Sequence, residues 1–266
     1  MTLASDTLAS THKVQNRGEQ KNMNEYIPFL SKSRFIKGIQ CYKALWLQTH
    51  RPELKDDIGD DKQAVFDFGH KVGRLAQQMF PDGIEVPFDD VPLAEQIEMT
   101  RRLIDSGTDT IFEAAFSYDN VFIKADLLTK SAAGWHLGEV KASTIAKENY
   151  IHDIAVQYYV VSSSGIRVEK ASLVLLTARY VRNGDVEPEN VFVWIDVTAE
   201  VLRRQETIRS EINVQRAMLK RGMPEIAIGQ QCRKPYDCDF AGYCRGGVPV
   251  NPVFDFAGTI AEKAAA

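Results

Sequence analysis

Four cysteines constrain the fold of this chain more than any other feature. Cys41 stands alone near the start of the 266-residue sequence, whereas Cys232, Cys238 and Cys244 lie within one short segment near its end. Free cysteines are usually buried one at a time. Three of them close together in a segment with proline and glycine therefore favour a shared ligand. If all four bind one cofactor, the fold must bring the two ends together and close a loop of about 190 residues.

The spacing of the three C-terminal cysteines favours an iron–sulfur cluster over zinc. Five residues separate each consecutive pair, whereas structural zinc sites use short knuckles with roughly two to four residues between the ligands. A [4Fe–4S] cluster needs four cysteine ligands and accepts varied spacing. We therefore predict a structural [4Fe–4S] cluster at Cys41, Cys232, Cys238 and Cys244. Zinc is the alternative, and independent free thiols are the third interpretation.

Composition sets few limits on the class of protein. The chain is 44% hydrophobic and 26% charged, as is ordinary for a soluble globular protein. The first 27 residues are polar and contain no basic start followed by an apolar core, so we expect no signal peptide and no membrane anchor. We therefore expect a cytoplasmic protein, where paired cysteines bind metal more often than they form disulfides. A disordered leader is expected over residues 1–27, a single domain over 28–247, and a tail over 248–266 in which a linker would begin.

Three helices are predicted before the first strand. Ser33 is placed to cap the first of these helices. Its apolar residues recur at helical spacing and are Phe35, Ile36, Ile39, Tyr42, Leu45 and Trp46. A second helix is expected over residues 61–79 and carries His70. Its apolar face comprises Val65, Phe68, Val72, Leu75 and Ala76. A third helix is expected over residues 92–106, so the chain begins with a helical segment.

The hydrophobic period then changes from helical to extended. Three strands are expected over residues 110–118, 121–129 and 135–141, joined by two short turns into an antiparallel meander. The segments that follow are read as a helix, two strands and a long helix, over residues 145–162, 171–180, 191–197 and 199–221 respectively. This order predicts an α/β fold, with a mixed sheet whose centre is the meander and helices on its faces.

Acidic side chains cross the predicted meander in a row. Because side chains alternate along a strand, Glu139 and Lys141 share one face, while Val140 points to the other. If the second turn is symmetric, Asp126 lies opposite Glu139, and a two-residue first turn sets Glu113 opposite Asp126. Carboxylates held opposite one another repel unless a positive charge lies between them. A divalent cation is the expected occupant.

A metal at this position would support phosphodiester hydrolysis. Magnesium uses one or two carboxylates together with the substrate phosphate, and water bound to such an ion becomes a better nucleophile. Lys141 is placed to orient that water or to stabilise developing negative charge. The alternative is that Glu139 and Lys141 solvate an edge strand, because a short D…E-x-K pattern is common by chance. The neighbouring helices with His70 and Gln157 favour the metal site.

Together these residues resemble the RecB-like branch of the PD-(D/E)XK nuclease superfamily. The resemblance is to the iron–sulfur exonucleases associated with CRISPR adaptation and to the cluster-bearing domain of the AddB helicase-nuclease subunit. It extends from Leu30-Ser31-Lys32-Ser33 through Cys41-Tyr42-Lys43-Ala44-Leu45-Trp46 to Cys244. It implies a restriction-endonuclease-like core closed by a C-terminal cysteine-rich region, and a partner of the helicase or nuclease/integrase kind.

The resemblance also implies roles for individual residues. The metal ligands it implies are His70, Asp126, Glu139 and Val140. The catalytic residues it implies are Lys141, Glu139, Asp126 and Gln157. Weaker candidates are Glu113, Tyr158 and Tyr159, although the tyrosine that the family carries four residues after Gln157 is Val161 here.

We therefore expect a Mg²⁺- or Mn²⁺-dependent deoxyribonuclease that acts as an exonuclease on single strands or ends. The expected phosphate contacts are Lys32, Arg34, Lys37 and Lys43. The net charge of −4 weighs against nonspecific binding of nucleic acid, although a nuclease needs carboxylates at its metal site. The alternatives are a cluster-bearing DNA-binding or scaffold module that does not cut, and a structural zinc protein. The enzyme is preferred because every expected site residue is present.

Overall fold

The computed structural model describes residues 28–57, 59–87 and 89–246. The predicted leader over residues 1–27 and tail over 248–266 lie outside the described residues. Within the described part of the chain, no helix is long and apolar enough to cross a membrane.

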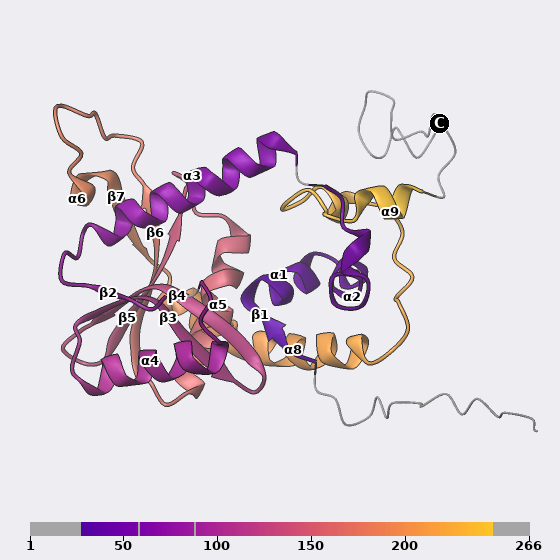
Figure 1. Cartoon of the computed structure of the whole chain (residues 1–266), viewed down its shortest axis with the longest axis horizontal. Coiled ribbons are helices and arrows are strands. Elements are labelled where there is room, and N and C mark those ends of the chain that lie inside the picture. The colour runs from indigo at the N-terminus through magenta and orange to yellow at the C-terminus, as the bar shows by residue number, and fades with distance from the viewer. Residues whose placement is uncertain (1–27, 58, 88, 247–266) are drawn as a thin grey trace, which may run out of the picture.

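A seven-stranded mixed sheet forms the centre of the fold (Figure 1). Six strands lie side by side in chain order: β2 (Ile84–Glu85), β3 (Thr110–Tyr118), β4 (Val121–Lys130), β5 (Trp135–Lys141), β6 (Val168–Leu176) and β7 (Phe192–Asp196). A short strand β1 (Leu30–Ser31) pairs in parallel with β4. Strands β3, β4 and β5 are antiparallel neighbours, and β6 runs parallel to β5. The predicted mixed sheet with a central meander is therefore confirmed.

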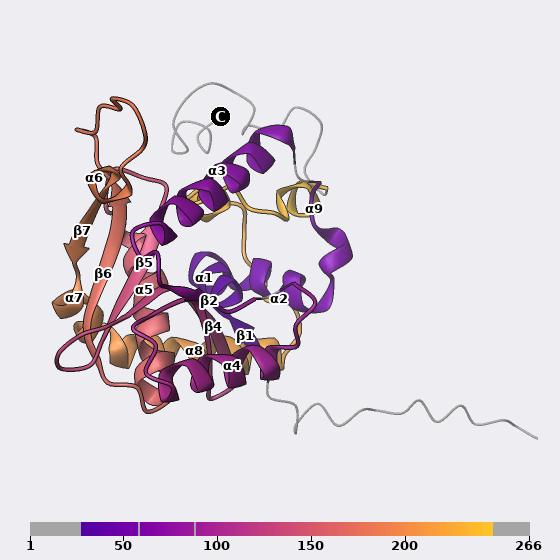
Figure 2. The same cartoon turned by 60° about the vertical axis from the view of Figure 1, so that its left-hand side comes forward.

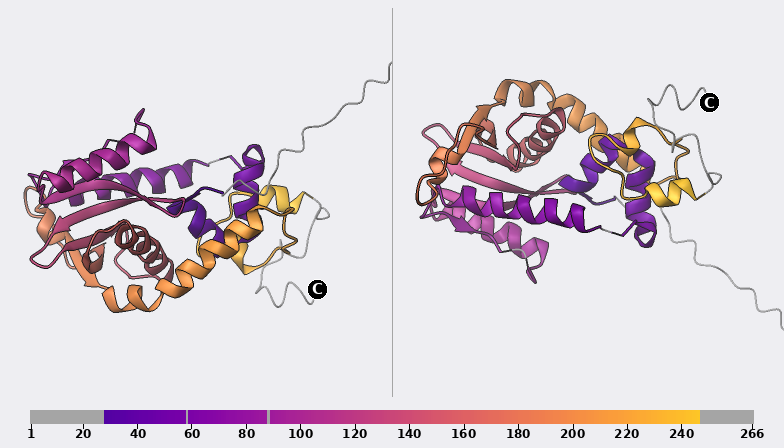
Figure 3. Two further views of the ribbon diagram at one scale, coloured as in Figure 1. Left: turned by 90° about the horizontal axis from the view of Figure 1, so that it is seen from below. Right: turned by 90° about the horizontal axis from the view of Figure 1, so that it is seen from above.

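Helices cover both faces of the sheet (Figure 3). On one face α5 (Glu148–Ser163) packs across β3, β4, β5 and β6, and on the other α3 (Asp60–Gln77) packs against β5. The remaining longer helices are α1 (Lys32–Gln40), α2 (Tyr42–His50), α4 (Leu93–Asp105), α7 (Thr198–Arg203) and α8 (Gln205–Leu219). The short helical segments are η1 (Pro52–Leu54), α6 (Pro188–Val191), η2 (Gln230–Cys232) and α9 (Ala241–Arg245).

The N-terminal helix predicted from Ser33 is two helices. The chain breaks between α1 and α2 at Cys41, whose φ of −163° and ψ of 116° are those of extended backbone. Ser31, rather than Ser33, caps α1, because its Oγ accepts a hydrogen bond from the Arg34 amide at 3.3 Å. The predicted helix over residues 199–221 is likewise divided, into α7 and α8.

The predicted apolar face of α3 is only partly buried. Val72 and Ala76 pack into the core beside β5, but Val65 is 68% exposed and Phe68 is 51% exposed. Figures 1 and 2 show the reason: the amino-terminal half of α3 extends past the sheet toward the segment that carries α9. Helical periodicity therefore located the helix correctly but overstated the length of its buried face.

Gly38 allows α1 and α8 to approach closely. A Cβ atom at this position would lie 2.3 Å from Cδ of Gln215, which is fully buried and donates to the Phe35 carbonyl at 3.0 Å. Since Gln215 is fully buried and would have to give up its hydrogen bonds to Phe35 and Glu211 to move, Gly38→Ala should lower the free energy of unfolding by roughly 1–3 kcal/mol, as measured by denaturant titration. Gly73→Ala is the matched control, because its Cβ meets no atom within 4 Å. Equal effects of the two substitutions would contradict this account of the α1–α8 contact.

Candidate functional site

The acidic residues lie at the point along β4 where its pairing partner changes from one strand to another. Its C-terminal half pairs with β5 and its N-terminal half with β1. The register Leu127↔Gly138 places Asp126 opposite Glu139, as predicted. On β3, Glu113 has a φ of +52°, in the left-handed region. The regular pairing of β3 with β4 is interrupted at Glu113 and at Asp126. The carboxylate of Asp126 points toward β5 and accepts a hydrogen bond from the Val140 amide at 2.8 Å.

Glu139 is the buried centre of this site. Its side chain is 1% exposed, and the ammonium of Lys141 lies 2.7 Å from its Oε1. The ammonium of Lys32, at the start of α1, lies 3.2 Å from both carboxylate oxygens. The side-chain amide of Gln157, on α5, donates a short hydrogen bond to Oε2. Lys141 also contacts Asp153, another α5 residue, at 2.5 Å. Residues of α1 and α5 thus meet the Glu139 carboxylate together with Lys141 of its own strand.

The charges of this cluster do not balance. Three carboxylates, Asp126, Glu139 and Asp153, face two ammonium groups, Lys32 and Lys141. Burial raises the pKa of Glu139, but Lys141 and Lys32 outweigh it, and the pKa is lowered overall. Burial and the neighbouring Glu139 raise the pKa of Asp126, and Lys32 offsets this only in part. The cluster thus has fewer ammonium groups than carboxylates, and of the two lysines it is Lys32 that pairs with Asp126, at 3.9 Å.

The donor set fits a hard divalent cation. Carboxylate oxygens, a backbone carbonyl and waters are the ligands that Mg²⁺ and Mn²⁺ prefer, and Asp126 and Glu139 supply two such carboxylates beside Val140. Oε1 of Gln157 is buried and accepts no hydrogen bond within the described residues, so a water on the cation could donate to it. The ammonium of Lys32 pairs with both of these carboxylates.

His70 is not brought into this cluster. It lies on the exposed side of α3. Across residues 28–57, 59–87 and 89–246, no group of three or more His, Cys, Asp or Glu side chains is arranged to hold a metal ion. The expected ligand set of His70, Asp126 and Glu139 is therefore not assembled. The spacing along the chain did not determine which side of α3 would face the sheet.

The other expected site residues divide into two groups. Gln157 contacts Glu139, and Glu113 lies nearby, paired with Lys124 at 3.0 Å. Tyr158 and Tyr159 instead line a groove between α5 and α8, away from the acidic cluster.

Of the four basic residues expected to contact phosphate, Lys32 lies in the acidic cluster. Arg34 donates to the Phe29 carbonyl at 3.3 Å. Lys37 pairs with Asp239, and the ammonium of Lys43 lies 5.8 Å from the centre of the Tyr243 ring.

Sequence reasoning missed Asp153 and the role of Lys32. The signal for Asp153 was available, because it precedes Gln157 by four residues and so shares its face of α5. Lys32 had no such signal, since its contact with Glu139 spans 107 positions of the chain.

All four cysteines are among the described residues and line one cavity, although no three of them are arranged as a set that could hold a metal ion. Cys41, at the α1–α2 break, lines it together with Cys232, Cys238 and Cys244. Ala44, Leu47 and Phe240 form a small apolar core beside it. Burial raises the pKa of the Cys238 and Cys244 thiols, and the other cysteines raise it further. Thiols in such a place ionise at neutral pH only when a cation or cluster stabilises the thiolates.

Asp239 ties the cysteine segment to the rest of the fold. Its carboxylate pairs with Lys37 of α1 and Lys62 of α3, and Lys55 lies 3.8 Å away. Burial raises the pKa of Asp239, but its bonds to Lys37 and Lys62 outweigh this and hold the pKa at about 2. Asp56 adds a second tie, because its carboxylate accepts from the Gly242 amide at 3.0 Å.

Asp239→Asn is expected to lower the free energy of unfolding at neutral pH by roughly 1.5–3 kcal/mol, since hydrogen bonds to charged groups are lost. The folded carboxylate stays ionised down to about pH 2, whereas an unfolded one takes up a proton near pH 4. The stabilisation is therefore complete above about pH 4 and is lost as the pH falls toward 2. Thermal melting should show the difference between wild type and Asp239→Asn shrinking over that window. The exposed neighbour Asp237→Asn is the control and should melt like wild type at every pH.

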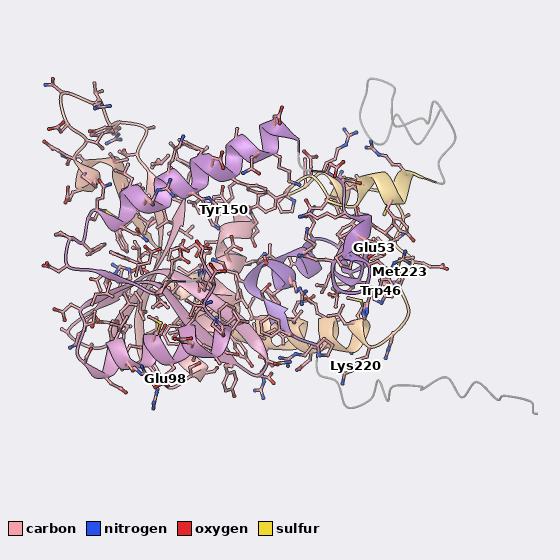
Figure 4. The ribbon with its side chains drawn as sticks, viewed as in Figure 1. Trp46, Glu53, Glu98, Tyr150, Lys220 and Met223 are labelled. Atoms are coloured by element: carbon pink, nitrogen blue, oxygen red, sulfur yellow. The ribbon has the colours of Figure 1, made fainter. Side chains whose placement is uncertain are left out.

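The cysteine segment also reaches the acidic cluster. The side-chain amide of Asn149, in the first turn of α5, donates a short hydrogen bond to the hydroxyl of Tyr236. The side-chain amide of Gln40, on α1, donates a hydrogen bond to the backbone carbonyl of the same tyrosine at 2.7 Å. Beside Asn149, the ring of Tyr150 (labelled in Figure 4) lies 5.2 Å from the ammonium of Lys141. The cysteine segment thus contacts the end of α5 that carries the acidic site.

Several solved structures are similar to this one. The crystal structure of LHK-Exo in complex with dAMP matches 72% of this chain and 88% of its own, with 15% identical residues and a TM-score of 0.40. The alkaline exonuclease LHK-Exo from Laribacter hongkongensis matches over 72% and 91%, with 15% identity and a TM-score of 0.37. A phage-related exonuclease from Haemophilus somnus 129PT matches over 74% and 96%, with 10% identity and a TM-score of 0.32. No family model and no curated protein matches the sequence.

Proposed function

We propose that this protein is a divalent-metal-dependent deoxyribonuclease that hydrolyses phosphodiester bonds. One observation carries the proposal: a buried glutamate, Glu139, is held against Lys141 on the same face of one strand, with Asp126 opposite on the next. A carboxylate pair within a cluster that holds more carboxylates than ammonium groups, with an amine 2.7 Å from one of its oxygens, suits a bound Mg²⁺ or Mn²⁺ and an attacking water.

Asp126, Glu139 and the backbone carbonyl of Val140 would hold the metal. When bound, such an ion lowers the pKa of water and neutralises phosphate oxygens. Lys141 would orient the nucleophilic water or stabilise negative charge on the phosphate, and Asp153 fixes its ammonium. Gln157 fixes the orientation of the Glu139 carboxylate. No ligand role is assigned to His70.

The four cysteines are proposed to hold a [4Fe–4S] cluster, with zinc as the alternative. Support comes from the convergence of four thiols from both ends of the described chain on one cavity. Such a cluster would have a structural role and would hold the segment from Cys232 to Cys244 against α1 and α5.

Anaerobic purification should give a brown protein with about four iron atoms per chain. Cys238→Ser should lose the iron and melt at a lower temperature. Stoichiometric zinc without iron would reject the cluster while leaving the nuclease proposal standing.

The finer features implied by the family resemblance are part of the same proposal. They are membership of the RecB-like iron–sulfur branch, exonuclease action on single strands or ends, and a helicase or nuclease/integrase partner. A reducing, cytoplasmic setting would suit the four described cysteines, none of which forms a disulfide.

Digestion of end-labelled DNA tests the activity. Wild-type protein should cut when Mg²⁺ or Mn²⁺ is supplied and should not cut in EDTA, and Glu139→Gln should be inactive with either metal although circular dichroism shows it folded. Single-stranded and blunt double-stranded substrates separate the proposed preferences. Binding of DNA without any cutting would instead favour a non-catalytic DNA-binding module. Cutting by Glu139→Gln at the wild-type rate would reject the site.

A further inference from the structure

Lys32 occupies a position that phosphate contact does not explain. Its ammonium lies 3.2 Å from both oxygens of Glu139 and 3.9 Å from Oδ1 of Asp126. The side chain is 25% exposed, so it reaches the cluster from the solvent side. The backbone is fixed there because Ser31 pairs with β4 in the sheet and caps α1.

The position of this ammonium is the one that a metal would need. Mg²⁺ binds carboxylate oxygens at about 2.0–2.1 Å, so an ion shared by Asp126 and Glu139 would fall in the space that the ammonium fills. Two cations cannot occupy that space together, because they would repel strongly in a partly desolvated site. Lys141 also contacts Glu139, but its second ion pair is with Asp153, whereas the second ion pair of Lys32 is with Asp126.

We propose that Lys32 is a resident cation that competes with the divalent metal for Asp126 and Glu139 and so sets the metal concentration at which the site is loaded. This inference rests on the proposed metal-dependent function. In the metal-free protein the ammonium offsets the charge of the buried carboxylates. On metal binding it is displaced toward solvent, through its exposed side. The observed affinity for metal is lowered accordingly, because only molecules with a vacated site can bind.

The competition predicts a gain in metal affinity when the ammonium is removed. Lys32→Met keeps the length of the side chain and loses the charge. Isothermal titration of Mn²⁺ alone into the anaerobically purified full chain should show Lys32→Met binding roughly 10- to 100-fold more tightly than wild type. Lys37→Met is the matched control, because this lysine of the same helix pairs with Asp239 instead, and its Mn²⁺ affinity should equal that of wild type.

Thermal melting gives a second readout that a merely structural lysine would not move. In EDTA, Lys32→Met should melt below wild type, because buried carboxylates lose their cation. Mn²⁺ should then raise its melting temperature by more than it raises that of wild type. If Lys32→Met does not fold, Lys32→Gln serves instead, because it keeps a hydrogen-bond donor to Glu139.

The possible failures are distinguishable. Equal or weaker Mn²⁺ binding by Lys32→Met, with wild-type binding that Glu139→Gln abolishes, would overturn the role of Lys32 and leave the metal site standing. Absence of any Mn²⁺ binding that depends on Glu139 would overturn the metal site and this inference with it.

Discussion

Replacing Lys141 by Met is expected to slow cleavage of DNA by roughly 10²- to 10⁴-fold, the range over which a positioned proton donor or charge-stabilising group contributes. Its ammonium lies 2.7 Å from Oε1 of Glu139 and 2.5 Å from Asp153. Methionine keeps the aliphatic stem near the ring of Tyr150 and removes only the charge. The effect should fall on the maximal rate rather than on the affinity for DNA, because the ammonium lies beside a proposed metal ligand, Glu139, and so acts on the reaction step.

Single-turnover cleavage of end-labelled DNA at saturating Mn²⁺ measures this effect. Lys147→Met is a matched control, because its ammonium lies 5.6 Å from the centre of the same Tyr150 ring, but the side chain is exposed. It should cut at nearly the wild-type rate. Because loss of Lys141 also leaves Asp153 without its partner, both variants should be assayed well below their melting temperatures. Equal rates for the two variants would remove Lys141 from the mechanism.

Asp126→Asn is expected to abolish metal-dependent cleavage without destabilising the metal-free protein. Asparagine can still accept the hydrogen bond from the Val140 amide, which lies 2.8 Å from Oδ2. It removes a carboxylate whose pKa is raised by burial and by Glu139, so its negative charge is unfavourable in the folded state. Without metal, the variant should therefore be at least as stable as wild type. This combination separates a functional carboxylate from one that serves the fold.

Melting curves in EDTA and in Mn²⁺ check this expectation together with the cleavage assay. Mn²⁺ should raise the melting temperature of wild type and leave that of Asp126→Asn unchanged. Asp109→Asn is the control, since Asp109 is 87% exposed at the end of the same sheet and should retain both activity and the metal response. Marked destabilisation of Asp126→Asn in EDTA would show that the carboxylate is structural.

The meander was predictable because its determinants are local. Alternating side chains and turns of defined length set the strand boundaries, and β3 and β5 cover the expected residues. The same arithmetic placed Asp126 opposite Glu139 and put Glu139 and Lys141 on one face, with Val140 in the opposite core. A period of two and a short turn leave little freedom in register.

Long-range contacts were not predictable in this way. The helix break at Cys41 lies where α2 packs beside the cysteine segment, and the periodicity of the sequence runs through it without interruption. His70 lies outside the acidic cluster because α3 presents another side to the sheet. The contact of Tyr236 with Asn149 joins residues 87 positions apart, and no spacing rule connects them.

The sequence by itself determined the mixed α/β class, the central hairpin with its acidic row, and the grouping of the cysteines at two ends of the chain. Only the tertiary structure decided which of these groups meet. It placed Lys32 between Asp126 and Glu139, left His70 exposed, and brought Cys41 into one cavity with the C-terminal trio. The physical reason is that backbone periodicity and turn geometry act over a few residues. The charge balance of a buried site depends on whichever distant side chains the packing of helices and sheet brings together.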